Sequence, residues 1–319
     1  MRKITLGRTN REISVISLGT WSFGGENMNG KIPVGWGNQS DFDSKIVLKK
    51  SWELGINHWD TADVYGEGKS ESIIGEMWKT IPRNDIFLAT KVGWDKGSYN
   101  HWYHPKHMQK NFERSLKNLK TNHIDLTYLH HCNFGKNNEY FDEAMNTILK
   151  FKEEGKTSFI GLSDWSSNRI MKFIKQLNPD VVQSYRNVLD DDYQSSGLKK
   201  YVDKNNLGVC FFSPIKHGLL TGKYNQIPKF NTGDHRKTIP DFQDITIIQK
   251  MKKNKVLLEK HFSNFKHPVL HGIIGALFND APTGCVLLGQ RNLKQVTIAA
   301  TLGSKILKKD SQWIKSLYK

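Results

Sequence analysis

Four side chains suited to proton transfer occur in the first half of the chain. Asp60 and Tyr65 lie in the segment Ile56-Asn-His-Trp-Asp-Thr-Ala-Asp-Val-Tyr-Gly66, and Lys91 and His130 follow at the ends of the next two apolar runs. A phenol has an ordinary pKa of about 10, so it donates a proton at neutral pH only with help from its surroundings. A buried ammonium, held in place by a carboxylate, supplies that help. If the four side chains converge, they form a proton-donating site for carbonyl chemistry.

Short apolar runs that resemble strands alternate with amphipathic, helix-like segments. The runs cover residues 15–18, 56–59, 86–89, 124–129, 159–162, 181–183, 207–212 and 285–288. This alternation favours parallel strands with helical crossovers, and runs that are apolar throughout suit strands covered on both faces. A doubly wound sheet is the alternative, but no G-x-G-x-x-G follows the first run. We therefore predict an α/β protein, a (β/α)8 TIM barrel that spans residues 1–319 as a single domain.

Polar residues and glycines recur where the predicted strands end. They are Gly19, Thr20, Asp60, Lys91, His130, Ser163, Gln183, Ser213 and Gly289. Barrel active sites form at the C-terminal face of the strands. We therefore expect these residues to surround one mouth, although the chain spaces them far apart.

The charge of the chain is strongly positive but dispersed. The formal net charge is +16, and only 9 of the 47 basic residues are arginine. Specific nucleic-acid binders concentrate arginine and aromatic residues on one face, so we expect no nucleic-acid partner and instead a solvated lysine surface that attracts an anionic cofactor or substrate. No apolar run approaches the length of a membrane span, and the basic start lacks the apolar segment of a signal peptide. Three separated cysteines fit a reducing compartment, so we expect a cytoplasmic protein with no membrane contact.

Several motifs, in order and on successive predicted strands, resemble those of the aldo-keto reductase family along nearly the whole chain. They are Ser17-Leu-Gly-Thr-Trp-Ser-Phe-Gly-Gly25, Gly55 to Gly66, Ala89-Thr-Lys-Val92, Ile124-Asp-Leu-Thr-Tyr-Leu-His130, Gly155-Lys, Ile160-Gly-Leu-Ser163, Ser213-Pro214 and Gly218-Leu-Leu-Thr-Gly-Lys-Tyr224. The resemblance implies that Tyr65 is the general acid, that Lys91 lowers its pKa and that Asp60 pairs with Lys91. It implies that His130 orients or polarises the carbonyl. The hydride would come from a nicotinamide cofactor, since no side chain supplies one.

The resemblance also implies a set of cofactor-binding residues. They are Gly19, Thr20, Trp21, Asp60, Ser163, Asp164, Gln183, Arg186, Ser213, Ile215, Gly218, Gly289, Arg291 and Gln295. Arg291 suits a ribose 2′-phosphate, because its planar fork binds phosphate with two parallel hydrogen bonds. We therefore expect NADPH (NADP+) as the cofactor rather than NADH.

Three positions depart from the family pattern. Asp164 replaces an asparagine, so an acceptor-only carboxylate stands where an amide both donates and accepts. Arg186 falls where an aromatic ring commonly stacks on the nicotinamide; either the guanidinium plane stacks there or Tyr185 takes that role. Ile298 and Ala299 stand where a Glu-Asn pair often contacts adenine.

The substrate side of the site is less defined by the sequence. Trp36, Trp94 and His131 are the candidate substrate contacts. Trp21, Trp36 and Trp94 either line an aromatic pocket or pack in the core. Neighbouring strand residues point to opposite faces, so we expect no metal at the His130-His131 pair. The favoured hypothesis is an NADPH-dependent reductase of an aldehyde or ketone. The alternative is a cofactor-bound regulatory or binding subunit with the same fold and little turnover, and the sequence does not define the oligomeric state.

Overall fold

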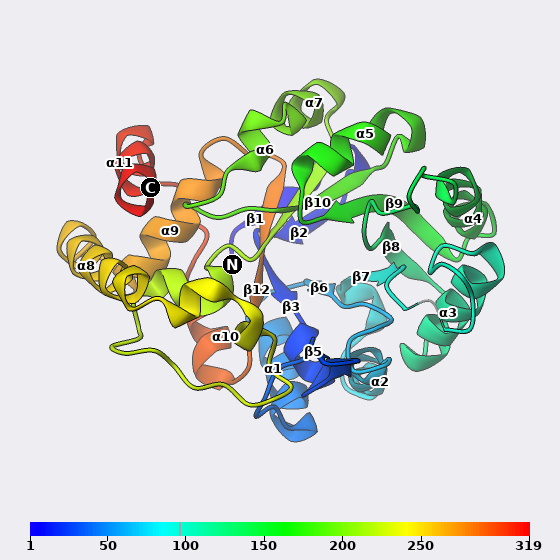
Figure 1. Ribbon diagram of the computed structural model, residues 1–319, viewed down its shortest axis with the longest axis horizontal. Helices are drawn as coiled ribbons and strands as arrows, with labels where there is room; N and C mark the ends of the chain where they lie inside the picture. The colour runs from blue at the N-terminus through cyan, green and yellow to red at the C-terminus, as the bar shows by residue number, and fades with distance from the viewer. Residues whose placement is uncertain (96) are drawn as a thin grey trace.

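The computed structural model describes residues 1–95 and 97–319, and its centre is a closed barrel of parallel strands inside a ring of helices (Figure 1). The neighbour order around the barrel is β10-β11-β12-β3-β6-β7-β8-β9, with β9 paired to β10. The barrel strands are β3 (Ile16–Gly19), β6 (His58–Asp60), β7 (Phe87–Val92), β8 (Ile124–Leu129), β9 (Thr157–Asp164), β10 (Val181–Tyr185), β11 (Gly208–Phe212) and β12 (Gly284–Gly289). The predicted (β/α)8 barrel is confirmed, and each of the eight apolar runs overlaps one of these strands.

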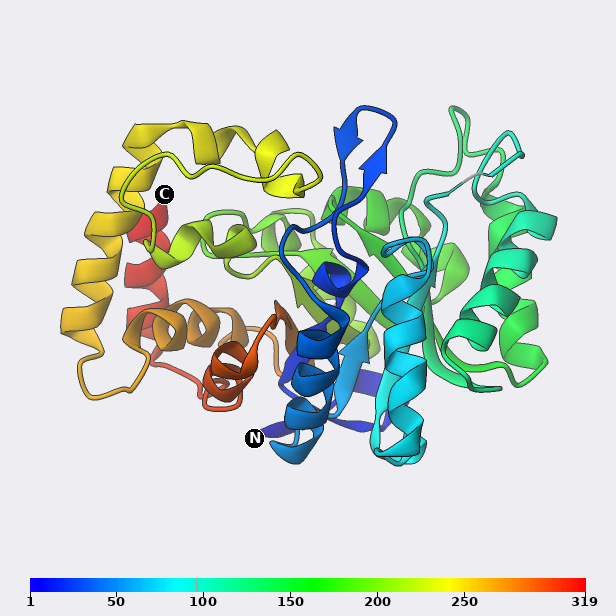
Figure 2. The same ribbon diagram turned by 90° about the horizontal axis from the view of Figure 1, so that it is seen from below.

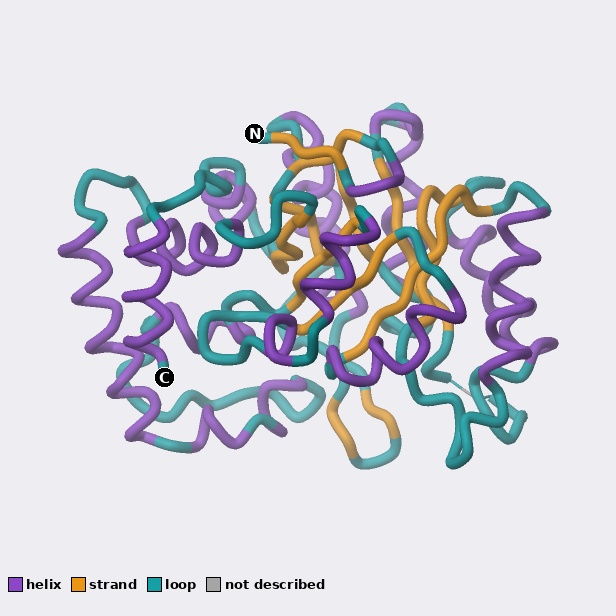
Figure 3. Tube along the Cα trace, turned by 90° about the horizontal axis from the view of Figure 1, so that it is seen from above, coloured by secondary structure: helices purple, strands orange, loops and turns teal. Residues whose placement is uncertain are grey.

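Helices follow the barrel strands and cover the outside of the barrel. They are α1 (Asp41–Glu53), α2 (Lys69–Gly75), α3 (Pro105–Asn118), α4 (Phe141–Glu153), α5 (Ser167–Leu177), α6 (Asp192–Ser195), α7 (Leu198–Asn205), α8 (Ile245–His261), α9 (Pro268–Phe278), α10 (Leu293–Ala299) and α11 (Lys308–Tyr318). The helix α3 begins at Pro105, whose fixed φ and missing N–H suit a first helical position. The helix α5 ends before Asn178, which takes a left-handed conformation ahead of Pro179. In Figures 1 and 3, α8, α9 and α11 lie together at one side of the barrel.

Two small hairpins lie at opposite ends of the barrel (Figure 2). The hairpin of β1 (Lys3–Thr5) and β2 (Glu12–Ser14) lies at the N-terminal face, and its apolar residues Leu6 and Ile13 join the core cluster at the bottom of the barrel. The hairpin of β4 (Met28–Asn29) and β5 (Ile32–Pro33) rises from the other face. The long connection between β11 and α8 runs over that face too, so the two segments flank the mouth of the barrel.

The barrel interior is filled in layers. One layer contains Ser17, His58, Tyr128, Cys210 and Cys285, which are all completely buried. Side chains two residues further along their strands face the same way, because side chains alternate along a strand. The next layer towards the mouth therefore includes the strand-end residues of the predicted site.

Within the described residues, no helix is long and apolar enough to cross a membrane.

Candidate active site

A large cavity opens at the C-terminal face of the barrel. Its volume is about 1240 Å³, and its wall comes from the strand ends and the loops that follow them. The predicted residues on this wall are Gly19, Thr20, Trp21, Trp36, Asp60, Tyr65, Trp94, His130, His131, Ser163, Asp164, Gln183, Ser213, Ile215, Gly218, Gly289, Arg291 and Gln295. Residues from all eight barrel strands or the loops after them are thus within reach of one bound molecule.

Asp60, Tyr65 and Lys91 meet at the floor of this cavity, where Asp60 and Tyr65 line the wall and Lys91 is buried behind them. The Lys91 ammonium donates to a carboxylate oxygen of Asp60, to the Thr61 carbonyl oxygen at 2.8 Å and to the Tyr65 hydroxyl at 3.3 Å. The other Asp60 oxygen accepts a hydrogen bond of 2.8 Å from the Gln183 amide, across the barrel. Lys91 and Asp60 are both about 1% exposed, so their charges depend on each other rather than on water. The carboxylate fixes the ammonium, and the ammonium reaches the phenol.

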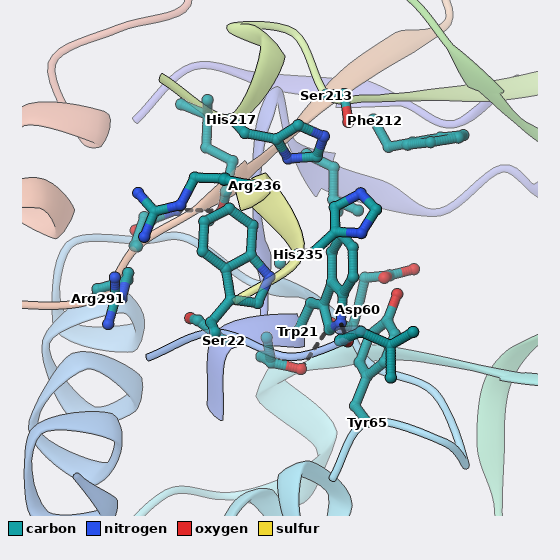
Figure 4. A pocket seen from close by; sticks show the side chains of 18 of the residues that line it. Trp21, Ser22, Asp60, Tyr65, Phe212, Ser213, His217, His235, Arg236 and Arg291 are labelled. Carbon is teal, nitrogen blue, oxygen red and sulfur yellow. Dashed lines mark hydrogen bonds between the residues drawn. The ribbon is translucent and has the colours of Figure 1, made fainter. Parts of the chain in front are cut away.

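Tyr65 reaches this position through a close contact between two loops. Gly66 has φ of +61°, and a Cβ atom at this residue would lie 2.4 Å from the Gly24 carbonyl oxygen. Only glycine allows this approach between the loops that follow β3 and β6. The Tyr65 ring then stacks on Trp21, with ring centroids 6.0 Å apart. Figure 4 shows the Tyr65 hydroxyl turned towards Asp60 at one end of the cavity.

Burial and charge act against each other at Tyr65. Burial raises the pKa of the Tyr65 phenol above its ordinary value, while the Lys91 ammonium pulls the pKa down and Asp60 raises it. At Lys91, burial favours the neutral amine, but the attraction of Asp60 outweighs this effect and raises the pKa of the ammonium. The phenol therefore stays protonated at neutral pH beside a permanent cation. Lys91 offsets part of the cost of phenolate formation, although the pKa remains raised overall.

His130 and His131 both face the cavity. Their rings stack with centroids 4.7 Å apart and an interplanar angle of 5°, so the prediction that they point to opposite faces is wrong. The strand β8 ends at Leu129, and side chains alternate only within a strand. Burial, followed by the charges of His131 and Lys91, holds the pKa of His130 well below its usual range. Burial likewise lowers the pKa of His131 to about 3, so both imidazoles are neutral at pH 7.

The opposite end of the cavity is lined by cations. Arg236 and Arg291 project there, away from Tyr65 (Figure 4), and Lys223, Lys255 and Lys294 also line the wall. The Arg291 guanidinium donates to the backbone carbonyls of Gly37 and Asn38 and to the Gln39 side chain at 3.1 Å. An anionic group would find several donors at this end, where the Asp234 carboxylate already pairs with Arg236 at 2.6 Å.

The turn after β11 has an unusual backbone. Ser213, Lys216, His217 and Gly218 have φ of +55°, +45°, +56° and +93°. Left-handed conformations of non-glycine residues are costly, and they concentrate at functional sites. The turn presents Ser213, Ile215 and Gly218 to the cavity between the proton-donating residues and the cationic end.

Arg186 was predicted to bind the cofactor, but it lies outside the cavity wall. Its guanidinium is fully buried outside the cavity wall, where it donates to Asp191 at 2.7 Å and to Asp280 at 2.9 Å. Arg186 lies one residue beyond β10, and its partners Asp191 and Asp280 lie next to the ends of α6 and α9, outside the barrel. Tyr185 is also absent from the wall, and Phe212, at the end of β11, is an aromatic side chain that lines the cavity there. Arg186 therefore stabilises the barrel exterior and does not line the cavity.

The substituted residue Asp164 lines the cavity, but its carboxylate is committed to the backbone. One oxygen accepts from the Cys132 N–H at 2.8 Å and the other from the Ser166 N–H at 2.7 Å. An acceptor-only side chain suits two donors. Ile298 and Ala299 also line the wall, so the adenine-side departures lie at the cavity and offer only apolar contact.

Several residues that line the cavity were not predicted from the sequence. They include Asp63, Arg114, Trp165, Phe212, His217, His235 and Arg236. Asp63 lies inside the recognised motif and Phe212 directly precedes Ser213, so strand-end position could have identified both. His235 and Arg236 lie in the long connection before α8, where no periodic pattern points to a site.

Asp63 is fully buried, and within the described residues its carboxyl oxygens have no hydrogen-bond partner. Burial and the nearby Glu71 raise the pKa of Asp63 well above its ordinary value.

This chain is similar to several known proteins. The model of the Aldo/keto reductase family matches residues 15–312. An aldo-keto reductase of Schizosaccharomyces pombe, whose name specifies NADP(+), is 31% identical over 231 residues, which are 68% of this chain and 67% of that protein. A probable voltage-gated potassium channel subunit beta of Arabidopsis thaliana is 27% identical over 236 residues, covering 71% of this chain and 67% of the relative.

The fold of this chain is similar to that of solved structures. A glycerol dehydrogenase from Gluconobacter oxydans has a TM-score of 0.80 at 24% identity, with 99% of this chain and 94% of that chain covered. This likeness concerns the fold alone. The family model, in contrast, matches most of the sequence, and its range includes every strand of the barrel. This chain therefore belongs to the aldo/keto reductase family.

Proposed function

We propose that this protein is an NADPH-dependent reductase that converts an aldehyde or ketone to an alcohol. The observation that carries the proposal is the contact of the Lys91 ammonium with both the Asp60 carboxylate and the Tyr65 hydroxyl at the cavity floor. Family membership supports the oxidoreductase class. A phenol beside a fixed cation is suited to give a proton to a carbonyl oxygen, and neutral His130 is suited to orient that oxygen.

The cavity fits a nicotinamide dinucleotide. Its cationic end, with Arg236 and Arg291, suits phosphate groups, and the turn after β11 offers Ser213 and Gly218 for the diphosphate. Ser163 and Gln183 are hydrogen-bonded to each other beside Asp60. An amide group bound there could both donate hydrogen bonds to these side chains and accept hydrogen bonds from them. The bound cofactor would supply the hydride. Arg291 favours NADPH over NADH, since a 2′-phosphate could replace the backbone carbonyls that its guanidinium now contacts.

In this reaction Tyr65 supplies the proton. As the phenol O–H transfers its proton to the carbonyl oxygen, negative charge develops on the Tyr65 oxygen, 3.3 Å from the Lys91 nitrogen. The Asp60 carboxylate and the Thr61 carbonyl keep the ammonium oriented throughout. The contact with Lys91 therefore strengthens as the transition state forms, which is the kind of interaction that raises kcat.

A fluorescence titration with NADPH and NADH, followed by turnover on a panel of aldehydes and ketones that includes a nitrobenzaldehyde, tests the proposal. We expect tighter binding of NADPH and reduction of simple aldehydes. Tyr65→Phe should abolish turnover and leave the NADPH Kd within a few fold. Unchanged turnover in this variant would refute the assigned acid. Tight NADPH binding without turnover on the whole panel would instead favour a cofactor-bound regulatory subunit.

A further inference from the structure

Two cysteines face each other inside the barrel, one layer below the candidate active site. Cys210 on β11 and Cys285 on β12 are partners in the parallel register, and their sulfur atoms lie 2.9 Å apart. Both are free thiols and completely buried. Adjacent strands lie about 4.8 Å apart, which is inside the Cα separation of about 4.4–6.8 Å that a disulfide requires. The backbone is thus already at bonding distance, and the sulfurs need to approach by only about 0.9 Å.

The environment makes one of the two thiols the nucleophile. His58 Nδ1 lies 3.7 Å from the Cys285 sulfur and 2.8 Å from the Ser17 hydroxyl. Burial favours the neutral thiol at both residues, while hydrogen bonds from Cys210 and His58 lower the pKa of Cys285. Cys285 is the sulfur that His58 contacts, so we assign it as the attacking sulfur and Cys210 as the thiol that resolves the product.

We propose that Cys210 and Cys285 form a peroxide-oxidisable dithiol that closes to a disulfide between β11 and β12. The Cys285 sulfur loses its proton, attacks an oxygen of a hydroperoxide and breaks the O–O bond. Cys285 becomes a sulfenic acid, and the released alkoxide or hydroxide takes up a proton. The Cys210 sulfur then attacks the Cys285 sulfur, and its proton leaves with the sulfenic oxygen as water. The two sulfurs lose two electrons in all, which reduce the hydroperoxide to an alcohol, or to water for hydrogen peroxide.

A metal ion is the competing use of this cluster, since ligand atoms of His58, Cys210 and Cys285 lie within 4.8 Å of one another. Two thiolates bound to one tetrahedral zinc ion are about 3.8 Å apart, given Zn–S bonds of about 2.3 Å, and these sulfurs are closer. A metal-bound imidazole almost always donates a hydrogen bond through its second nitrogen. His58 Nε2 has no such partner among the described residues. The geometry therefore favours a sulfur–sulfur bond over a metal site.

Burial restricts which oxidants can act. Hydrogen peroxide is almost as small as water and can enter through local opening of the barrel, whereas glutathione disulfide cannot reach two sulfurs with no exposed surface. The disulfide would join residues 75 apart in the chain. A crosslink over so long a loop mainly restricts the unfolded chain, so the oxidised protein should have a higher Tm than the reduced protein.

Counting free thiols tests the proposal on the full chain. The reduced protein is treated with hydrogen peroxide under native conditions, denatured in the presence of an alkylating reagent, and weighed by mass spectrometry. Three alkyl groups attach to the untreated protein, one for each free cysteine. After peroxide we expect a single alkyl group, on Cys132, and a Cys210–Cys285 crosslinked peptide lighter by two hydrogen atoms. Glutathione disulfide should leave all three thiols alkylated.

Variants check the order of the steps. In Cys210→Ala the resolving thiol is absent, so Cys285 should gain oxygen atoms, whereas Cys132→Ala should form the crosslink as the wild-type chain does. Three alkyl groups after peroxide would overturn the proposal, and so would a disulfide that includes Cys132. Zinc bound by the purified reduced protein, with Cys210 and Cys285 protected from alkylation until a chelator is added, would overturn it in favour of a metal site. The wild-type measurement decides the matter even if a cysteine variant fails to fold.

Discussion

Replacing Lys91 with methionine tests how the proposed acid works. The substitution keeps the length of the side chain and removes the cation 3.3 Å from the Tyr65 hydroxyl. Two unit charges at that separation interact by about 5 kcal/mol in a medium of effective dielectric near 20, and a hydrogen bond to a charged group contributes about 1.5–3 kcal/mol. We take a value between these two estimates, a loss of about 3–4 kcal/mol of transition-state stabilisation. This loss corresponds to a fall in kcat of about 10²- to 10³-fold, at about 1.4 kcal/mol per factor of ten.

The assay is kcat at saturating NADPH as a function of pH. Activity requires the protonated phenol, so kcat falls as pH rises through the pKa of Tyr65. The Lys91 cation lowers that pKa, so in Lys91→Met the descending limb should move to higher pH. Lys117→Met, on the exposed face of α3, is the matched control and should retain wild-type activity. A folded Lys91→Met variant with kcat within threefold of wild type and an unshifted limb would refute the role assigned to Lys91.

Three further predictions concern charged residues around the barrel. Arg186→Met should lower the free energy of unfolding by about 1.5–3 kcal/mol, because Asp191 and Asp280 lose a buried partner and keep Lys315, while the NADPH Kd of the folded protein stays unchanged; a weakened Kd would restore Arg186 to the site. Arg291→Met should weaken NADPH binding by about 10- to 100-fold and leave NADH binding unaltered, and equal losses for both cofactors would contradict the 2′-phosphate assignment. Asp63→Asn should raise the free energy of unfolding at pH 7, because the folded protein holds the carboxyl protonated while the unfolded chain ionises it. This gain should grow as pH rises above about 3.9 and vanish below that pH. A difference between variant and wild type that does not change with pH in denaturant titrations would argue against a neutral Asp63.

The sequence predicts the barrel and the floor of the site because both depend on local patterns. Each strand carries its own apolar run, and a parallel barrel places every strand end at one face. Asp60, Lys91 and Tyr65 could therefore be brought together without coordinates. Their residue types leave few stable alternatives, because a buried ammonium needs a carboxylate nearby.

The sequence fails where placement depends on a strand's last residue or on an irregular segment. Arg186 lies one residue beyond β10, so neither its residue type nor strand alternation fixes whether its side chain points into the barrel or out of it. His131 shows the same limit, since alternation no longer holds beyond the end of β8. Arg236 belongs to a connection with no periodic pattern. Its position depends on tertiary contacts, with Asp234 at 2.6 Å and with the Trp36 ring, whose centroid is 4.7 Å from the guanidinium.

The hydrogen bonds of Lys91 have a consequence for the reactivity of the site. An ammonium has three N–H donors, and Asp60, Thr61 and Tyr65 accept from this nitrogen. Its raised pKa keeps it protonated, so the nitrogen lacks the free lone pair that condensation with a carbonyl compound needs. A primary amine can thus lie next to a bound aldehyde without forming a Schiff base. Reactive aldehydes would then inactivate this site no faster than they modify exposed lysines elsewhere on the protein.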